Sequence, residues 1–190
     1  SLTPLFLGAT PLVVEEGVYA GWSAMSHEGT RGFELMDALD DVQQAQALEV
    51  ADVPGDVLYG VGHKDLPQAT GLQAAEMNAG QQRLLRVLVE EYVRNTDFDV
   101  AEAQLAAIEA AGWDQLRFAW RGATDDAGAL FYYRVQGERI LIELLHRPDH
   151  IHSMLRDPGN DYGERWLDET VAEDYSSRDR FDAADRAHQN

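Results

Sequence analysis

Two histidines separated by one residue, His150 and His152, are the clearest candidates for chemistry in this sequence. In an extended chain, alternate side chains point to the same face, with their Cα atoms about 6.6 Å apart. Neutral imidazole is a ligand that suits Zn, Fe, Mn, Cu and Ni, and a neighbouring carboxylate would complete the charge at such a site. The pair therefore predicts a divalent transition-metal site. The alternatives are a hydrogen-bonded pair with a structural or substrate-binding role, and acid–base catalysis without a metal.

The neighbours of these histidines depend on how the preceding hairpin folds. Residues 129–135 and 139–145 alternate with a period of two, and Gln136–Gly137 or Gly137–Glu138 is the expected two-residue turn. Both registers give one apolar face, which is formed by Phe131, Tyr133, Val135, Ile140, Ile142 and Leu144. The other face is mixed and is formed by Leu130, Tyr132, Arg134, Leu141 and Glu143. If Ile151 lies in the core, both imidazoles share the face of Glu143.

Two acids and two arginines complete the predicted site. Glu143 or Asp157 would be a third metal ligand or a general base. Arg134 or Arg156 would orient an anionic group or stabilise developing charge. Arg156 and Asp157 also begin a run rich in turn-forming residues, 156–163, and are expected to pair and fix that turn. The reaction class that this set favours is metal-dependent hydrolysis.

A different class of function is also compatible with these residues. A non-catalytic binding or assembly protein would use the same histidines, with Tyr132 and Tyr133, to line a ligand cleft or a subunit interface. The sequence contains no G-x-S-x-G, no H-E-x-x-H, no glycine-rich phosphate loop and no G-x-G-x-x-G. The hydrolases, proteases and nucleotide-binding proteins that depend on those motifs therefore find little support in the sequence.

Composition excludes several kinds of partner and site. The 34 acidic and 15 basic residues give a formal net charge of −19, whereas nucleic acids and anionic membranes require basic surfaces. The chain has no cysteine, which rules out disulfides, thiolate zinc sites and cysteine nucleophiles. Exported and cytoplasmic locations are both compatible with that absence. No apolar run approaches the length of about 18 residues that a membrane span needs, whereas a small-molecule ligand is compatible with the composition.

Sequence periodicity predicts an α+β fold. Helices are expected at 30–39, 40–48, 78–95 and 99–111. Strands are expected at 2–8, 116–121, 129–135, 139–145 and 150–155. The predicted architecture is a helical N-terminal half packed on an antiparallel β-meander.

Local signals delimit several of these elements. Asp40 or Asp41 is the expected N-cap of the second helix, and Asp99 with Glu102 resembles a capping box for the fourth. Residues 51–70 contain repeated Gly and Pro and are expected to form an irregular connection. Irregular connections of this length are often functional or lie over a partner.

The domain boundaries follow from the same pattern. Residues 1–175 are expected to form one α+β domain, with a helical stretch near 164–173, and the polar tail at 176–190 is expected to be disordered. The chain begins with neither an initiator Met nor a signal peptide. The apolar run 2–8 reads as a buried strand, in which Pro4 indicates a sheet edge or the start of a strand. We therefore expect an upstream half or a partner chain to complete the sheet.

The chain resembles a bacterial family, domain-of-unknown-function family 3500, along nearly its whole length. The motifs that carry this resemblance are LFLGATP at 5–11, DVLYG at 56–60, RLLRVLVEEYV at 83–93, FAWRGAT at 118–124, YYRVQG at 132–137, LIE at 141–143 and HIHSMLRDPGNDYG at 150–163. The last is the most specific. One departure is the segment between the final two motifs, LLHRPD with His146 and Asp149, which in the family is a longer loop rich in Asn and Asp.

The resemblance carries expectations of its own. It implies that full-length members contain two related halves and that this chain corresponds to the C-terminal half, preceded by the last strand of the first half. A site between the halves would then be only half present here, unless the other half is a separate chain. The family has no established activity, so the resemblance implies a fold and the location of a site.

Overall fold

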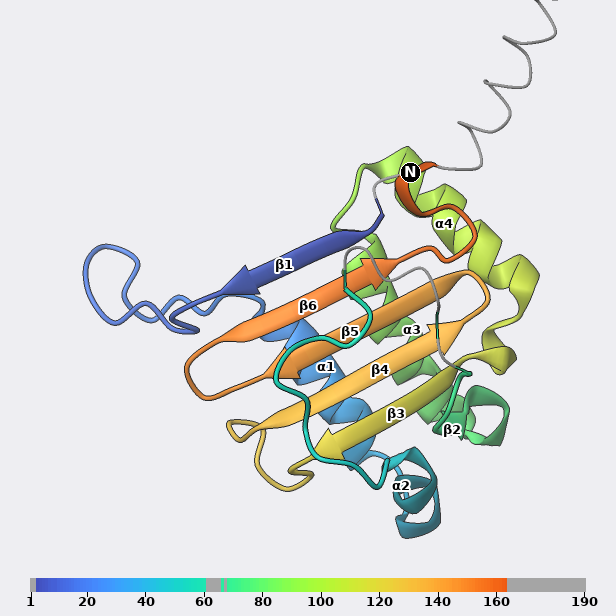
Figure 1. Ribbon diagram of the computed structural model, residues 1–190, viewed down its shortest axis with the longest axis horizontal. Coiled ribbons are helices and arrows are strands. Elements are labelled where there is room, and N and C mark those ends of the chain that lie inside the picture. The colour runs from blue at the N-terminus through green and yellow to red at the C-terminus, as the bar shows by residue number, and fades with distance from the viewer. Residues whose placement is uncertain (1–2, 61–65, 67, 164–190) are drawn as a thin grey trace, which may run out of the picture.

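The computed structural model describes residues 3–60, 66 and 68–163. Within them, one antiparallel sheet has the strand order β1-β6-β5-β4-β3-β2 (Figure 1). Its strands are β1 (Leu5–Ala9), β2 (Leu72–Gln73), β3 (Arg117–Gly122), β4 (Phe131–Gly137), β5 (Ile140–His146) and β6 (Ile151–Arg156). The α-helices are α1 (Ser26–Asp37), α2 (Asp41–Ala47), α3 (Ala79–Val93) and α4 (Phe98–Ala111). The predicted α+β fold, with its antiparallel meander, is confirmed.

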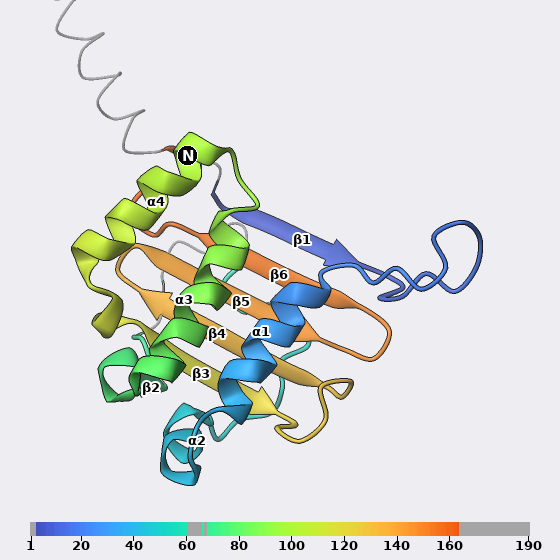
Figure 2. The same ribbon diagram turned by 180° about the vertical axis from the view of Figure 1, so that it is seen from behind.

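The two faces of the sheet have different covers. Helices α1, α3 and α4 lie behind the sheet in Figure 1 and in front of it in Figure 2. Residues 49–60, which follow α2, cross the opposite face without forming a helix or strand (Figure 1). We call residues 49–60 the strap. The sheet therefore has an apolar face under helices and a polar face under an irregular segment. The Gly- and Pro-rich composition of this region predicted its lack of regular structure, but not its position on the sheet.

The register of the central hairpin confirms which side chains share a face. Arg134 of β4 lies opposite Glu143 of β5, and the turn consists of Glu138 and Arg139. The turn predicted at Gln136–Gly137 or Gly137–Glu138 is thus wrong by one or two positions. The predicted faces nevertheless hold, because sliding one strand by an even number of residues leaves every side chain on its original face.

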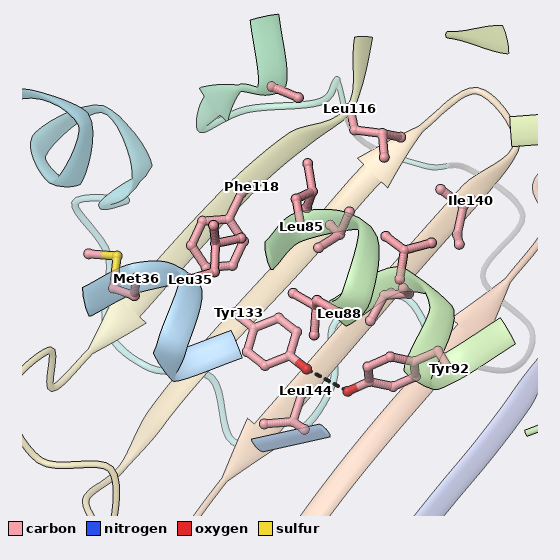
Figure 3. Close-up of a cluster of buried hydrophobic side chains, with 14 of the residues drawn as sticks. Leu35, Met36, Leu85, Leu88, Tyr92, Leu116, Phe118, Tyr133, Ile140 and Leu144 are labelled. Carbon is pink, nitrogen blue, oxygen red and sulfur yellow. Dashed lines mark hydrogen bonds between the residues drawn. The ribbon is translucent and has the colours of Figure 1, made fainter. Parts of the chain in front are cut away.

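The apolar face and the helices enclose a core built around aromatic side chains. Trp120 and Tyr133 are fully buried. The Tyr133 hydroxyl donates to the Glu28 carbonyl at 2.8 Å and shares a 2.7 Å hydrogen bond with the Tyr92 hydroxyl (Figure 3). Burial raises the pKa of both phenols, so they remain neutral and satisfy each other inside the core.

β1 corrects the expectation of a buried N-terminal strand. It pairs antiparallel with β6 of the same chain, with Leu7 opposite Ser153, and therefore belongs to a sheet that this chain itself forms. It is an edge strand: within the described residues no strand lies on its other side, and Phe6 and Leu7 are exposed. Its apolar sequence suggested burial, but an edge position leaves one side uncovered. The edge position and the start at Leu5 agree with what Pro4 indicated.

Helix ends agree with local signals except at two places. Asp40 caps α2 in a capping box with Gln43, as predicted. Asp97 caps α4 by accepting from the backbone N–H of Asp99, so the predicted capping box at Asp99 is wrong. Helix α1 begins four residues before the predicted start, with Met25 as its N-cap and no side-chain cap.

Two further predictions concern membranes and the C-terminal region. In the part of the chain that the structure describes, no helix is long and apolar enough to cross a bilayer. The helical stretch predicted near 164–173 and the polar tail at 176–190 lie outside the described residues.

Candidate functional site

The two histidines lie side by side on the polar face of the sheet. Their ring centroids are 5.1 Å apart, and the intervening Ile151 belongs to the hydrophobic core. Met154 lies opposite Glu143, so His152, two residues before Met154, projects from the same face as Glu143. This is the orientation that the alternation of side chains along the strand predicted.

Each imidazole is oriented by a carboxylate. The Nδ1 atom of His150 lies 2.9 Å from Asp149 Oδ1, and that of His152 lies 2.8 Å from Asp56 Oδ1. A carboxylate oxygen accepts, so each Nδ1 carries the proton, and in the neutral ring Nε2 then bears a lone pair. This is the arrangement in which a carboxylate prepares a histidine to bind a metal or to accept a proton.

Residues of the edge strand β1 pack against the ring of His152. The ring of Phe6 lies 5.3 Å from that of His152, centroid to centroid. A Cβ atom added at Gly8 would lie 2.9 Å from His152 Cδ2, closer than real Cβ contacts. The ring therefore rests directly on the β1 backbone, which only glycine permits.

Glu143, the predicted third ligand or general base, anchors the strap. Its side chain is fully buried. It accepts from the backbone N–H groups of Leu58 and Tyr59 at 2.8 and 2.9 Å and from the Tyr132 hydroxyl at 2.7 Å. Burial raises the pKa of this carboxyl, and the three hydrogen bonds act in the opposite direction. Glu143 thus fixes the strap that carries Asp56, the partner of His152.

Arg156, a predicted contact for an anionic group, is a second strap anchor. It is buried, donates from Nη1 to the Tyr59 carbonyl at 3.1 Å, and pairs through Nε with Asp161 at 2.8 Å. The expected pairing with Asp157 is wrong. Successive side chains at the end of a strand point to opposite faces, and Asp157 accepts instead from Arg139 at 3.0 and 2.9 Å.

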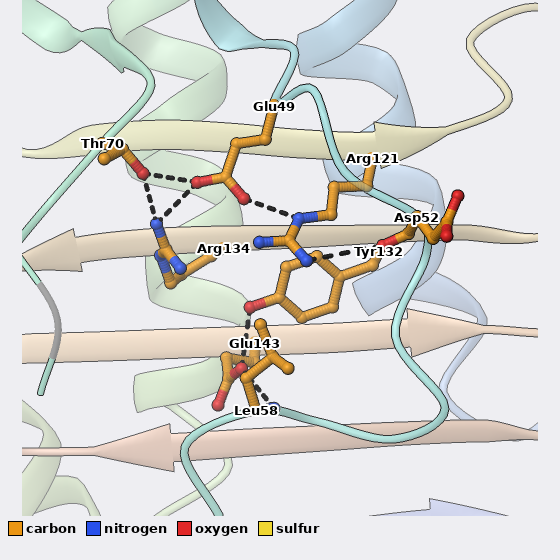
Figure 4. Close-up of polar contacts among 8 residues, drawn as sticks. All are labelled: Glu49, Asp52, Leu58, Thr70, Arg121, Tyr132, Arg134 and Glu143. Atoms are coloured by element: carbon orange, nitrogen blue, oxygen red, sulfur yellow. Dashed lines mark hydrogen bonds and ion pairs between the residues drawn. The ribbon is translucent and has the colours of Figure 1, made fainter.

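Arg134, the other predicted anion contact, is buried and belongs to a partly exposed polar network at the base of the strap (Figure 4). Its Nη2 donates to Glu49 Oε1 at 2.9 Å and to the Thr70 hydroxyl at 2.6 Å. Glu49 also accepts from Arg121 at 2.7 Å and from the Thr70 hydroxyl. The network joins both ends of the connection between α2 and β2 to the sheet.

The charge state of Glu49 follows from this network. Burial by itself would raise the pKa of its carboxyl. The hydrogen bonds from Thr70 and Arg121 and the charges of Arg134 and Arg121 outweigh burial, so the pKa is lowered from its ordinary 4.5. Glu49 is therefore ionised whenever the fold is intact above that value.

This shift predicts a pH-dependent contribution to stability. A folded pKa below the unfolded pKa stabilises the protein above the unfolded value, and that stability is lost as pH falls through the folded pKa. Glu49→Gln is therefore expected to be less stable than the wild type at neutral pH, with a difference that shrinks as the pH falls below 4.5. Urea denaturation at a series of pH values measures it. Exposed Glu138→Gln is the control, and a difference that does not vary with pH would contradict the prediction.

The structure brings together only part of the predicted site. His150 and His152 meet, whereas Glu143, Arg134 and Arg156 hold the strap and Asp157 pairs with Arg139. Among the described residues, no group of three or more His, Asp or Glu side chains is arranged to hold a metal ion. The carboxylates that do contact the imidazoles, Asp56 and Asp149, were not predicted.

Different signals existed for these two missed residues. Asp149 directly precedes His150, so its proximity was readable from the chain. Asp56 is 96 positions from His152, and its only sequence signal was the motif DVLYG, which begins with it.

Comparisons with known proteins place the chain in a family. The family model described as "Protein of unknown function (DUF3500)" matches residues 1–164, which include every strand and helix described above. No curated protein and no solved structure matches the chain. Because the match covers most of the 190 residues, the chain belongs to the DUF3500 family of proteins of unknown function.

Proposed function

We propose that this protein is a metal-dependent hydrolytic enzyme whose divalent transition metal is bound by His150 and His152. One observation carries the proposal: two adjacent imidazoles, each with its Nδ1 on a carboxylate oxygen, leave two Nε2 lone pairs on one face of a sheet. Zn, Fe, Mn, Cu and Ni all suit imidazole nitrogen.

The donor set fits a metal with open coordination positions. Two protein ligands leave room for water and for a substrate oxygen. The bound ion would act as a Lewis acid and lower the pKa of a coordinated water. Asp149 and Asp56 hold the rings in the required tautomer, and the fixed strap holds Asp56.

In this proposal Glu143, Arg134 and Arg156 act indirectly, without contacting the metal. The side chains of Arg134 and Arg156 are only 3% and 6% exposed and already face Glu49 and Asp161. Glu143 has no exposed surface. We therefore assign these three residues to positioning the strap, and the further ligands to solvent and substrate.

Metal binding is the first test. Purified protein without an affinity tag is expected to bind one equivalent of Zn²⁺ in titration calorimetry, and the double variant His150→Ala/His152→Ala is expected to lose that binding. The control is His27→Ala, a histidine with an exposed side chain on α1. Hydrolysis of nitrophenyl ester and phosphodiester probes by the metal-loaded protein, lost in the double variant, would support the enzymatic part. Unchanged Zn²⁺ affinity in the double variant would refute the proposal.

A second test concerns the carboxylate that orients His152. Asp56→Asn retains the shape of the side chain but removes its charge, and loss of such a partner lowers metal affinity by about 10–100-fold. Asp52→Asn, in the same strap, is the control because its carboxylate contacts neither histidine. Equal Zn²⁺ affinities of the two variants would show that Asp56 does not prepare the site.

The second candidate is a non-catalytic binding or assembly protein. Tyr132 and Tyr133 cannot line its cleft as expected, because both are fully buried. What favours this candidate is the exposed edge of β1, with Phe6 and Leu7 on it. An upstream half, a partner chain or a further copy would complete the sheet there.

A further inference from the structure

A hairpin arm projects from the sheet directly after β1. Residues 10–25, which we call the arm, extend beyond the end of the strands in both views (Figures 1 and 2). The arm is closed by its own hydrogen bonds, from the Val14 N–H to the Trp22 carbonyl and from the Gly21 N–H to the Val14 carbonyl, both at 2.8 Å. An isolated hairpin of this length is marginally stable in water, so a surface that receives the arm would stabilise it.

The arm and β1 concentrate the exposed apolar surface of the protein. Seven of the fifteen large hydrophobic side chains that are exposed in the described residues lie between positions 6 and 22, which marks this strip as an interaction surface. They are Phe6, Leu7, Val13, Val14, Val18, Tyr19 and Trp22. Val18 is 93% exposed and Trp22 is 69% exposed.

The five residues of β1, LFLGA, include no charge and no proline, although Pro4 directly precedes them. No strand among the described residues pairs with the outer side of β1. Natural edge strands carry charges, proline or bulges within them to prevent pairing with other chains. An uncharged edge beside an apolar arm is a template for another strand.

We propose that the surface is the interface of a symmetric dimer, in which β1 of one copy pairs antiparallel with β1 of a second copy. Antiparallel pairing of identical strands is isologous, so one patch serves both subunits. The result is one continuous sheet across the dimer. The interface adjoins the histidine site, because Phe6 and Gly8 of β1 contact His152, but the strand pairing does not depend on the proposed metal chemistry.

The geometry of this pairing gives each arm a place on the partner. The arm leaves the C-terminal end of β1, and antiparallel pairing sets that end beside the N-terminal end of the other β1. There the Tyr162 N–H donates to the Thr3 carbonyl at 2.7 Å, and the start of α4 lies beside the start of β1 in both views (Figures 1 and 2). Phe98, 70% exposed, and Tyr162, 50% exposed, offer apolar surface to the incoming arm.

Charge is compatible with this arrangement despite the net charge of −19. Residues 1–14 contain no charged side chain, so the strand pair itself is neutral. Glu15 and Glu16 lie in the arm, and the two arms are at opposite ends of an antiparallel pair. The remaining repulsion is long-range and is screened by salt beyond about 8 Å at physiological ionic strength. Dimerisation is therefore expected to tighten as salt is raised.

Sedimentation equilibrium tests the proposal. The wild type is expected to dimerise, and Leu7→Lys and Trp22→Ala are each expected to raise the dissociation constant at least tenfold. Val42→Lys, at an exposed position on α2 outside the strip, is the matched control and is expected to change nothing. Circular dichroism of each variant verifies folding.

A cross-link tests the strand pair directly. The chain has no native cysteine, and a pairing centred on Leu7, the middle of β1, puts the two Leu7 residues opposite each other. Opposed residues of antiparallel strands have Cα atoms about 4.5–5.5 Å apart, which suits a disulfide. Leu7→Cys is expected to form a disulfide-linked dimer on mild oxidation, and Val42→Cys is not.

Two outcomes would overturn the proposal. A wild type that stays monomeric at every concentration, together with no cross-link through Leu7→Cys, would leave the edge to an upstream half or another chain. A monomer that co-sediments with phosphatidylcholine vesicles, and loses this property in Trp22→Ala, would assign the arm to a lipid surface.

Discussion

Glu143→Ala is expected to lower the free energy of unfolding by about 3–5 kcal/mol, because it leaves one buried and two partly buried donors without their acceptor. The donors are the N–H groups of Leu58 and Tyr59 and the hydroxyl of Tyr132. For a protein of this size, such a loss corresponds to a fall in Tm of about 6–20 °C. Urea denaturation and calorimetry measure both quantities.

Two measurements distinguish the loss of the strap anchor from the general effect of removing a carboxylate. Glu138→Ala removes an exposed acid from the adjoining turn and is expected to change stability by less than about 0.5 kcal/mol. Glu143→Ala is also expected to weaken Zn²⁺ binding, since the strap carries Asp56 to His152. If Glu143→Ala were as stable as Glu138→Ala, the strap would not depend on this carboxylate.

Gly71→Ala is expected to destabilise the protein by about 2–5 kcal/mol through backbone strain and a steric clash. Gly71 has φ +97°, a conformation that L side chains rarely adopt. A Cβ atom there would lie 2.2 Å from the carbonyl oxygen of Phe118, which belongs to the backbone of β3 and cannot move aside. The same glycine accepts from Arg117 and follows Thr70 of the Glu49 network. Chemical denaturation measures the loss.

Two other glycines separate strain from clash. Gly17 has φ +86° with no atom within 4 Å of an added Cβ, so Gly17→Ala measures strain alone, about 1–2 kcal/mol. Gly55 lies in the strap with neither feature, and Gly55→Ala is expected to be neutral or slightly stabilising. If Gly71→Ala cost no more than Gly17→Ala, the close approach to Phe118 would carry no penalty.

Alternation along the strands determined much of the candidate site in advance. The partition of β4 and β5 into an apolar and a polar face, and the placement of both imidazoles with Glu143, depend only on the period of two. These predictions hold although the turn lies one or two residues from its predicted position. The turn shift changes the pairing register of the two strands by an even number of residues, which leaves every side chain on its face. Helix positions and the cap at Asp40 were equally local properties.

The use of the polar face was decided by tertiary structure. The sequence predicted that Glu143, Arg134 and Arg156 would face solvent or substrate. In the fold a segment about 85 positions from Glu143 covers that face and takes up its hydrogen bonds. A buried carboxylate or guanidinium must be paired, and its partners are chosen by which distant backbone reaches it.

Side-chain type and spacing by themselves determined the fold class, the two faces of the meander and the adjacency of His150 and His152. Tertiary structure alone decided that Asp56 orients His152, that Arg156 pairs with Asp161, and that β1 pairs with β6 of the same chain. The physical reason is range: backbone periodicity acts between neighbours in the chain, whereas pairing and burial depend on contacts that form only when distant segments meet.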